Sequence, residues 1–255
     1  MKTKKIGLVG IYFPGAYDAL HENVPEGFEL VDALSPEAYG NLADCEYLIS
    51  RLDIDPDIIN HTPNVKFWQR WGAGFDHVDL KAWGERGIPI ATCPGVNSGI
   101  VAELAIMLML AGYRNLLQIN RQLRAGHWPR TEYFGRSFMI KGKTVGVLGL
   151  GHIGKKVAAL ASAFGANVIY YDIVRQPEQE EQFGYRFVDF DTLLKESDIF
   201  TIHCPLNEET RGMIGAAQFA KMKPTAMLIN TARGPIVDEA ALVDALTTGK
   251  IATAG

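Results

Sequence analysis

The sequence predicts an α/β protein that consists of two doubly wound domains, each built on a parallel sheet. Short apolar runs of strand length alternate with helical stretches through both halves of the chain, which is typical of parallel sheets covered by helices on both faces. A chain of 255 residues is long enough for two modest domains. Cys93-Pro94-Gly95 interrupts the alternation, and we place the first domain at residues 1–97 and the second at residues 98–255.

In the first half, apolar runs predict buried strands at residues 5–10, 28–32, 46–50, 65–71 and 88–91. Helices are predicted between them at residues 16–22, from Ser35, from Asp55 to about His61, and at residues 79–86. Ser35 and Asp55 each precede a proline. A polar N-cap followed by proline at the first helical position is a common helix start.

A long helix is predicted next, from Ser98 to about Arg124. Its first half is apolar nearly all round, so we expect it to be buried between the two domains. Residues 126–138 follow and are rich in aromatic side chains without a clear period. Two interpretations stay open for this stretch: an arm that packs on another subunit, or a loop that covers its own domain.

In the second half, strands are predicted at residues 144–148, 167–171, 185–188, 198–203 and 226–230, and a further strand begins at Ile251. A helix follows the first of these strands and is closed by Gly165. Further helices are predicted at residues 189–196, 216–222 and 238–247, and residues 176–184 are polar and loop-like.

The turn after the strand at residues 144–148 has the spacing G-x-G-x-x-G, formed by Gly149, Gly151 and Gly154. In a dinucleotide-binding unit the first glycine permits the tight turn, the second lets the backbone approach the pyrophosphate, and the third lets helix and strand pack closely. The N-terminus of the following helix offers N–H groups to the phosphates. The alternative is a structural βαβ unit with an incidental glycine turn.

Asp172 ends the next strand, 18 residues after Gly154. A carboxylate at about this position contacts the ribose hydroxyls in dinucleotide-binding units. Because a carboxylate repels a 2′-phosphate, Asp172 favours NAD over NADP. Arg175 lies close by in the sequence, so NADP stays open as an alternative cofactor.

The composition is that of an ordinary globular protein, with 47% hydrophobic and 21% charged residues. A net charge of −4 gives no basic surface for nucleic acid. The cysteines, Cys45, Cys93 and Cys204, are odd in number and lack C-x-x-C spacing, which fits a reducing compartment. We see neither a signal peptide nor an apolar run long enough to span a membrane, so we expect a cytoplasmic protein.

In an open parallel sheet, ligands bind outside the carboxyl ends of the strands. In the second half this rule selects the glycine loop, Asp172, the segment His203-Cys204-Pro205 and the segment Thr231-Ala232-Arg233. In the first half it selects Gly72-Ala73-Gly74, whose backbone N–H groups could face a small anion such as a carboxylate. An ordinary tight turn is the alternative there.

Arg233 could hold a substrate carboxylate with its planar fork and polarise the adjacent carbonyl. Without its context, an ordinary surface arginine is the simpler interpretation. Its position at the carboxyl end of a strand favours a role in substrate binding. Hydride transfer also needs a proton donor, usually histidine, but none of the six histidines is an obvious acid. We expect His203 to pack on the cofactor. No group of residues has the spacing of metal ligands.

The motifs together resemble the D-isomer-specific 2-hydroxyacid dehydrogenase family along nearly the whole chain. The resemblance is carried by GAGFDHVDL, CPGVNSGIVAELA, VGVLGLGHIGKKVA, HCPLNEETRGMI and NTARGPIVDEAAL. It implies a flavodoxin-like substrate domain and a Rossmann NAD-binding domain, with NAD and a 2-oxo or 2-hydroxy acid in the cleft between them. It also implies a homodimer formed through the NAD-binding domains.

The resemblance implies a role for each matching residue. Ala73 lies in the loop that meets the substrate or the nicotinamide, and His152 and Ile153 give backbone N–H groups to the pyrophosphate. It implies that Asp172 holds the adenosine ribose and that Cys204 and Pro205 line the adenine side. Thr231, Ala232 and Arg233 would flank the nicotinamide, and Arg233 would also orient the substrate.

The family's catalytic set also includes a Glu and a His, which follow the strand that begins here at Ile251 and would lie beyond Gly255. The resemblance therefore predicts a truncated NAD-binding domain, a substrate domain without its C-terminal return, and a chain that binds NAD weakly without turnover. Two hypotheses stay open: a fragment of an NAD-dependent oxidoreductase, or a non-catalytic NAD-binding or regulatory protein.

The substrate's side chain is expected to meet the first domain, where Arg51, Arg70 and Trp71 lie near strand ends. A basic residue there could favour a phosphorylated acid such as 3-phosphoglycerate. Plain surface charge and core packing are the alternative.

Overall fold

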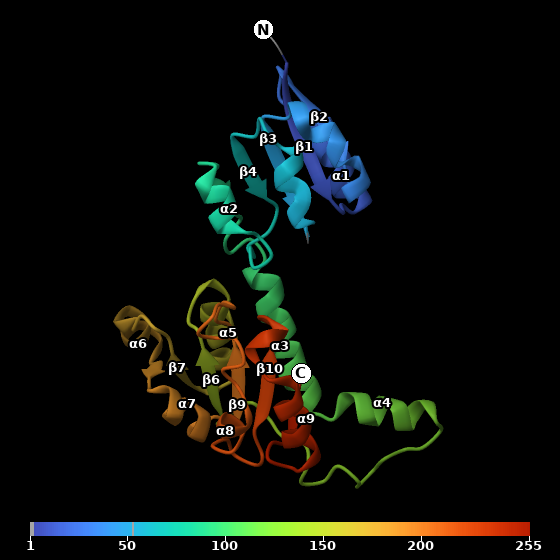
Figure 1. The fold of residues 1–255 in the computed structure, drawn as a ribbon. Coiled ribbons are helices and arrows are strands. Elements are labelled where there is room, and N and C mark those ends of the chain that lie inside the picture. The colour runs from blue at the N-terminus through green and yellow to red at the C-terminus, as the bar shows by residue number, and fades with distance from the viewer. Residues whose placement is uncertain (1–2, 53) are drawn as a thin grey trace. The chain divides into compact units, whose positions relative to one another are not determined.

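The computed structural model describes residues 3–52 and 54–255. The chain divides into two compact units, Met1–Val96 and Asn97–Gly255. Each unit contains its own parallel sheet (Figure 1). The predicted α/β class with doubly wound parallel sheets is confirmed.

The first unit has a sheet in the order β2-β1-β3-β4-β5, in which all paired strands are parallel. This is the strand order of flavodoxin-like sheets. Its strands are β1 (Lys4–Gly10), β2 (Phe28–Ala33), β3 (Tyr47–Arg51), β4 (Phe67–Arg70) and β5 (Ile90–Ala91), and its helices are α1 (Pro14–Glu22) and α2 (Leu80–Glu85).

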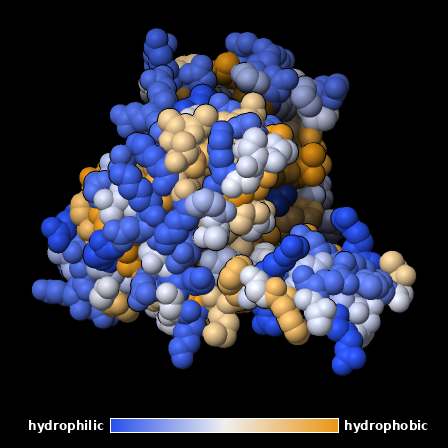
Figure 2. Space-filling view, turned by 90° about the horizontal axis from the view of Figure 1, so that it is seen from below, coloured by the Kyte–Doolittle hydropathy of each residue, from blue (hydrophilic) through white to orange (hydrophobic). Residues whose placement is uncertain are grey.

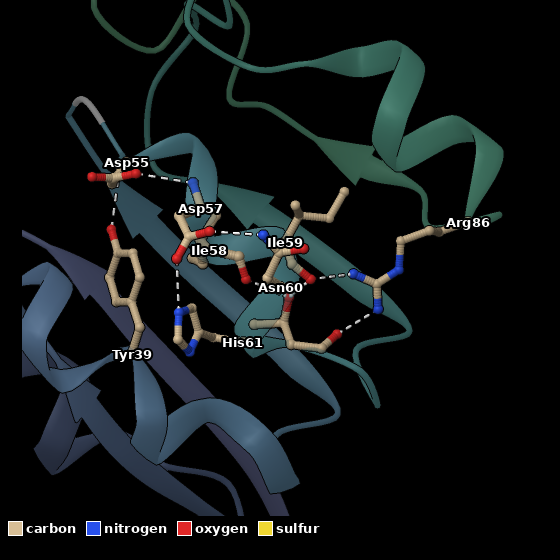
Figure 3. Close-up of polar contacts among 9 residues, drawn as sticks. Tyr39, Asp55, Asp57, Ile58, Ile59, Asn60, His61 and Arg86 are labelled. Atoms are coloured by element: carbon tan, nitrogen blue, oxygen red, sulfur yellow. Dashed lines mark hydrogen bonds and ion pairs between the residues drawn. The ribbon is translucent and has the colours of Figure 1, made fainter.

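The predicted helices after Ser35 and Asp55 are short 3-10 helices, η1 (Pro36–Asp44) and η2 (Pro56–His61). Side chains satisfy the backbone of η2, as Figure 3 shows. Asp55 accepts a hydrogen bond from the Asp57 N–H at 2.9 Å, and Arg86 donates to the Ile59 carbonyl at 2.6 Å. Asp57 in turn binds the side chains of Asn60 and His61, and both contacts lower the pKa of its carboxyl group.

The second unit has a sheet in the order β11-β10-β9-β6-β7-β8, again with parallel pairs. Counted from β6, this is the 3-2-1-4-5-6 order of a dinucleotide-binding fold. Its strands are β6 (Thr144–Leu148), β7 (Asn167–Tyr171), β8 (Arg186–Phe187), β9 (Ile199–Ile202), β10 (Met227–Asn230) and β11 (Thr253–Ala254). The other elements are α3 (Ser98–Tyr113), α4 (Leu116–Arg124), α5 (His152–Ala163), α6 (Pro177–Phe183), α7 (Phe190–Glu196), α8 (Ala216–Phe219), η3 (Gly234–Ile236) and α9 (Glu239–Thr247).

The single long helix predicted from Ser98 to Arg124 is wrong, because the chain forms two helices, α3 and α4, bent by 62°. The break is at Asn115, which has a left-handed backbone with φ of 50°. Asparagine is one of the few residues that adopt this conformation readily. The Asn115 side chain also donates to the Arg136 carbonyl at 2.9 Å, which ties the bend to the segment that follows α4.

Helix α3 is only partly buried, although its first half is apolar nearly all round. Ala102, Ala105 and Met109 are fully buried and pack against the core of the second unit. On other faces of the helix, Ile100 is 75% exposed and Met107 is 55% exposed. Within its own unit the helix therefore leaves an apolar surface uncovered.

Residues 176–184 were predicted as a polar loop, and this prediction is wrong. Residues Pro177–Phe183 form α6, with Pro177 at the helix start and Gly184 in a left-handed conformation, φ 71°, at its end. Proline at the start and glycine at the end are strong helix boundaries. The helix has no buried residue, so the sequence shows no apolar stripe from which to predict it.

The second sheet is buried on both faces. One core contains Val145, Val147 and Tyr170 with residues of α3 and α5. The other contains Leu148 and Phe200 with residues of α7, α8 and α9. Strands that are buried on both faces read as nearly continuous apolar runs rather than as alternating patterns, which is why the sequence marks them clearly.

Asp198 precedes β9 and binds two neighbouring segments. Its carboxylate accepts the Thr144 N–H at 2.9 Å and pairs with Lys223 at 2.8 Å. Burial by itself raises the pKa of Asp198, but the hydrogen bonds from Lys223 and Thr144 outweigh it, and the pKa lies below its ordinary value. The stabilisation that the Asp198 carboxylate gives the folded state is therefore fully present above its pKa in the unfolded chain. It is lost as the pH falls through the lower pKa that Asp198 has in the folded chain.

We expect Asp198→Asn to lower the free energy of unfolding by about 1–3 kcal/mol at neutral pH, because a charge-assisted hydrogen bond is lost. Urea unfolding at pH 7 and near pH 3 checks this. The difference between wild type and variant should shrink at the acid end. Glu208→Gln, at an exposed residue, is the control, and an equal loss in that variant would contradict the assignment.

Candidate functional site

The candidate site lies at the carboxyl edge of the second sheet, where β6 and β9 are neighbours. The chain leaves β6 toward β7 and leaves β9 toward β10, on opposite sides, so this is the point where the strand order reverses. Ligands of open α/β sheets bind at such a point. A pocket of about 260 Å³ opens there; it is lined by Leu148, Gly149, Gly151, Tyr171, Asp172, Ile173, His203, Cys204, Pro205, Asn207, Glu209, Thr210 and Met213.

The glycine loop depends on its glycines for two different reasons. Gly149 has φ of 90°, and a Cβ there would lie 2.7 Å from the Cys204 nitrogen. A Cβ on Gly154 would lie 2.0 Å from the Gly149 carbonyl oxygen. A Cβ on Gly151 would meet nothing within 4 Å. Gly149 and Gly154 are therefore needed by the fold, whereas the space beside Gly151 is open to a ligand.

Helix α5 begins directly after this loop. Its first hydrogen bond runs from the Lys155 N–H to the Gly151 carbonyl at 3.0 Å. The N–H groups of His152, Ile153 and Gly154 precede that bond and have no helical acceptor. They carry the positive end of the helix dipole, to which anionic groups bind favourably. The His152 residue itself is exposed.

Asp172 lines the pocket and is fixed by the backbone. Its Oδ2 accepts the Leu150 N–H at 2.7 Å, and its Oδ1 accepts the Val174 N–H at 3.2 Å. Gln176 reaches the same loop from the other direction, since its side-chain amide donates to the Leu150 carbonyl at 2.8 Å. Two backbone N–H groups therefore hold the carboxylate at the pocket.

His203 follows β9 and keeps some exposed surface, but its ring is enclosed. Nε2 lies 2.8 Å from the Thr201 hydroxyl. Within the described chain its buried Nδ1 has no hydrogen-bond partner. Burial lowers the pKa of His203 to about 4, so the imidazole is neutral at physiological pH. Burial likewise raises the pKa of the adjacent Cys204 thiol to about 11, which leaves it protonated and a poor nucleophile.

The enclosed His203 ring should make the second unit sensitive to mild acid. The unfolded chain binds a proton near pH 6.5 and the folded chain only near pH 4, so stability falls as the pH drops between these values. The loss over this window is expected to reach at most about 3 kcal/mol. Melting temperatures between pH 7 and pH 4 check this. His203→Gln should flatten the profile, and a slope equal to that of the wild type would contradict the prediction.

Thr231, Ala232 and Arg233 follow β10 at the same edge. Arg233 is exposed and donates from Nη1 to the Ala232 carbonyl at 2.8 Å. Thr231 carries a buried hydroxyl that has no partner within the described chain. In the described structure these three residues are not among those that line the pocket, so the edge has two separate groups of candidate residues.

Sequence reasoning missed Asn230, the last residue of β10. Its side-chain amide donates to the Arg233 carbonyl at 2.9 Å, and its Oδ1 accepts the Ala232 N–H at 3.0 Å. These two bonds fold the Thr231–Arg233 segment back on the strand end. The sequence does place an asparagine at the end of an apolar strand. Asparagine side chains at such positions commonly form hydrogen bonds with the backbone of the following turn, so this pattern could have predicted the role of Asn230.

In the first unit, the loop Gly72-Ala73-Gly74 is partly committed to its own backbone. The Gly72 N–H donates to the Arg70 carbonyl at 3.1 Å, and the Gly72 carbonyl accepts the Cys93 N–H at 2.9 Å. Arg70 is buried and donates to the Leu52 carbonyl at 2.8 Å. The Gly72 N–H therefore points into the loop rather than toward a ligand.

Arg51 and Trp71 lie near strand ends of the first unit. The Arg51 guanidinium lies 4.6 Å from the ring centroid of Phe13 and donates to the Ile11 carbonyl at 3.1 Å. Trp71 packs edge to face with Tyr12 at a centroid distance of 5.9 Å. In residues 3–52 and 54–255 no group of three or more His, Cys, Asp or Glu side chains is placed to hold a metal ion.

Residues 106–255 match the family model described as D-isomer specific 2-hydroxyacid dehydrogenase, NAD binding domain. The chain belongs to the D-isomer specific 2-hydroxyacid dehydrogenase family. The family predicted from the sequence is therefore confirmed, and so is NAD as the cofactor of the second unit. This agrees with the strand order, the glycine loop and the carboxylate that lines the pocket.

Known members of the family are similar to this chain over most of its length. The D-3-phosphoglycerate dehydrogenase of Archaeoglobus fulgidus is 44% identical over 205 residues, which is 80% of this chain and 38% of that protein. The glyoxylate reductase of Thermococcus litoralis is 41% identical over 207 residues, 79% of this chain and 62% of that protein. The chain thus spans less than two thirds of the length of either relative.

Two solved structures are similar to nearly the whole chain. A glyoxylate reductase from Paecilomyes thermophila has a TM-score of 0.84 and 34% identity, and the match covers 100% of this chain and 81% of that one. An NAD-dependent formate dehydrogenase from Staphylococcus aureus, in complex with NAD, has a TM-score of 0.86 and 30% identity, and covers 98% and 80%. These proteins are named for different substrates, so membership of the family leaves the substrate open.

Proposed function

We propose that this protein is an oxidoreductase that transfers a hydride between NAD(H) and a D-2-hydroxy acid or its 2-oxo acid. The observation that carries the proposal is the carboxyl edge of the second sheet. There the glycine loop, Asp172 and His203 surround one pocket, and Arg233 follows a strand of the same edge. In this reading the first unit is the substrate domain and the second the NAD-binding domain.

The residues of the second unit fit a dinucleotide. The N–H groups of His152 and Ile153 at the start of α5 would bind the pyrophosphate beside Gly151, where the loop has open space. Asp172 would accept hydrogen bonds from the adenosine ribose, and Cys204 and Pro205, which line the same pocket, would contact the adenine. His203 and Thr231 each have a buried polar atom without a hydrogen-bond partner among the described residues, which gives this edge two further polar groups for a ligand.

When bound, NADH supplies the hydride. Arg233 binds the substrate carboxylate through its planar fork and places a positive charge beside the carbonyl oxygen, on which negative charge develops. The two bonds from Asn230 fix the backbone of the segment that carries Arg233. His203 stays neutral, because burial lowers its pKa to about 4, and it contributes no acid near neutral pH. The proton that converts the resulting alkoxide into the hydroxyl group therefore comes from another donor of the complete protein.

For the substrate we propose that Gly72-Ala73-Gly74 meets the carboxylate end of the acid and that Arg51 is the basic group nearest its side chain. The Gly72 N–H donates to Arg70, and among the described residues no backbone acceptor is assigned to the N–H groups of Ala73 and Gly74. Because Arg51 already contacts Phe13 and the Ile11 carbonyl, a phosphorylated acid would have to compete for it. Small unphosphorylated 2-oxo acids therefore fit this surface better.

The test is turnover by the complete protein. NADH oxidation is measured with glyoxylate, pyruvate and hydroxypyruvate, and NAD reduction with the D and L isomers of the matching hydroxy acids and with 3-phosphoglycerate. We expect turnover of a small 2-oxo acid and preference for the D isomer. Tight NADH binding without turnover of any acid would contradict the proposal and favour a non-catalytic NAD-binding protein.

We further propose that the protein is a cytoplasmic homodimer that associates through the second unit. Three features support the association through the second unit. Helix α4 has no buried residue. Trp128 and Phe134 in the segment that follows it are 72% and 77% exposed. A groove of about 460 Å³ is lined mainly by apolar residues of α3 and α4, including Met107, Leu110 and Leu116.

The face of the molecule in Figure 2 is largely hydrophilic, with hydrophobic residues exposed between the hydrophilic ones. In the described residues no single helix is long and apolar enough to cross a membrane, and only the bent pair α3–α4 reaches that length and composition together.

Sedimentation of the complete protein tests the proposed dimer. A monomer at micromolar concentration would contradict it.

A further inference from the structure

The segment after Asp172 contains a cation that the ribose-binding interpretation leaves unused. Arg175 follows Asp172 by three positions in the loop between β7 and α6. A guanidinium at this place could reach a 2′-phosphate, because the carboxylate at the end of β7 marks the ribose. Whether the site accepts NADP thus depends on where the Arg175 side chain is held.

The structure holds Arg175 against α6. Its Nε donates to Glu180 Oε1 at 2.9 Å and its Nη2 donates to Glu180 Oε2 at 2.8 Å. This two-bond fork is the strongest geometry available to an arginine and a carboxylate. The guanidinium also lies 5.7 Å from the ring centroid of Phe187 in β8, so the side chain is directed toward α6 and β8.

Glu180 is itself fixed, unlike most surface carboxylates. Its side chain is 19% exposed, whereas that of Arg175 is 61% exposed. The Tyr170 hydroxyl donates to Glu180 Oε1 at 2.9 Å and accepts the Gln176 N–H at 2.8 Å. Since the acceptor stays in place, Arg175 must break both bonds before it can turn to another anion.

The backbone of this loop is fixed as well. Gln176 donates from its side chain to the Leu150 carbonyl, and Asp172 accepts the Leu150 N–H. The two bonds attach the loop to the glycine turn on both sides of Arg175. A change at Glu180 should therefore release the Arg175 side chain without moving the backbone that presents Asp172.

We propose that Glu180 is a positioning residue for cofactor specificity, which holds Arg175 away from the ribose 2′ position and so disfavours NADP. The inference rests on the proposed NAD-binding role of Asp172. In this view discrimination against the 2′-phosphate has two parts: repulsion by Asp172, and removal of the nearby arginine that would otherwise compensate for it.

The experiment uses Glu180→Gln, which keeps the length of the side chain and a hydrogen-bond acceptor for Tyr170 but removes the charge. NADH binding is followed by nucleotide fluorescence, and NADP⁺ is titrated as the competitor. We expect the affinity for NADP⁺ to rise by roughly two- to fivefold, the strength of an exposed ion pair. The NADH dissociation constant should stay within about twofold of the wild-type value.

Two further variants separate the proposed mechanism from a general charge effect. Glu181→Gln makes the same charge change on the next, exposed residue of α6 and should leave NADP⁺ affinity unchanged. Adding Arg175→Met to Glu180→Gln should abolish the gain. A gain equal to that of Glu181→Gln, or a gain that persists without Arg175, would overturn the inference.

The binding data also distinguish this inference from the proposed function. Normal NADH binding with unchanged NADP⁺ affinity in Glu180→Gln overturns the role of Glu180 alone. A folded wild-type protein that binds neither nucleotide overturns the dinucleotide site and this inference with it.

Discussion

Replacing Gly151 with alanine is expected to weaken NADH binding by on the order of 100-fold, because the methyl group blocks the approach of the pyrophosphate to the backbone and removes charge-assisted hydrogen bonds. The fold should tolerate the change. Gly151 has an extended backbone with φ of −80°, and an added Cβ meets nothing within 4 Å. Calorimetric titration with NADH and a thermal melt of the free protein measure the two effects separately.

Gly154→Ala is the contrasting variant in the same loop. Its Cβ would lie 2.0 Å from the Gly149 carbonyl oxygen, so it should lose several kcal/mol of stability as well as the cofactor. Gly15→Ala, in α1 and with open space around its Cβ, should change neither property. If Gly151→Ala bound NADH as well as the wild type, the loop would not be the pyrophosphate site.

Replacing Arg233 with alanine should lower kcat/KM of the complete protein by about 10²–10³-fold for its best 2-oxo acid, the usual cost of losing one preorganised charge at a developing oxyanion. Arg233→Lys should restore little of this loss, because an ammonium group cannot form the planar two-bond contact with a carboxylate. Steady-state kinetics with varied acid and saturating NADH measure the change.

The stability and the cofactor site should survive the loss of the Arg233 side chain, since the residue is exposed and Asn230 bonds its backbone carbonyl. NADH affinity within about threefold of the wild-type value is therefore expected. Arg211→Ala, also at an exposed arginine of the second unit, is the matched control. Equal kinetic losses in both variants would show that Arg233 acts only through general surface charge.

The sheets were predictable because their strands are buried. Runs such as residues 144–148 and 226–230 are apolar on both faces and flanked by turn residues, and β6 and β10 appear there with shifts of at most one residue. Helices that pack on no core were not predictable. Helix α6 buries no residue, and the break between α3 and α4 depends on the backbone conformation of Asn115.

The candidate site was predictable in position more than in contacts. The rule for strand ends correctly brings Gly149, Asp172 and His203 to one pocket, because a parallel sheet aligns all its carboxyl ends. The partners of these residues lie on other segments. That Asp172 binds the Leu150 N–H and that Arg175 binds Glu180 depends on side-chain directions that spacing alone does not contain.

The attachment of the Asp172 loop to the glycine turn has a consequence for the thermodynamics of binding. Both hydrogen-bonding groups of the Leu150 backbone are occupied, one by Asp172 and one by Gln176. The two loops that flank the pocket are thus ordered when the chain folds. Cofactor binding therefore does not have to supply the free energy for ordering them, and the affinity for the cofactor is higher than it would be with mobile loops. Weakening the bond at Gln176, which touches no proposed ligand group, should therefore make binding entropically less favourable.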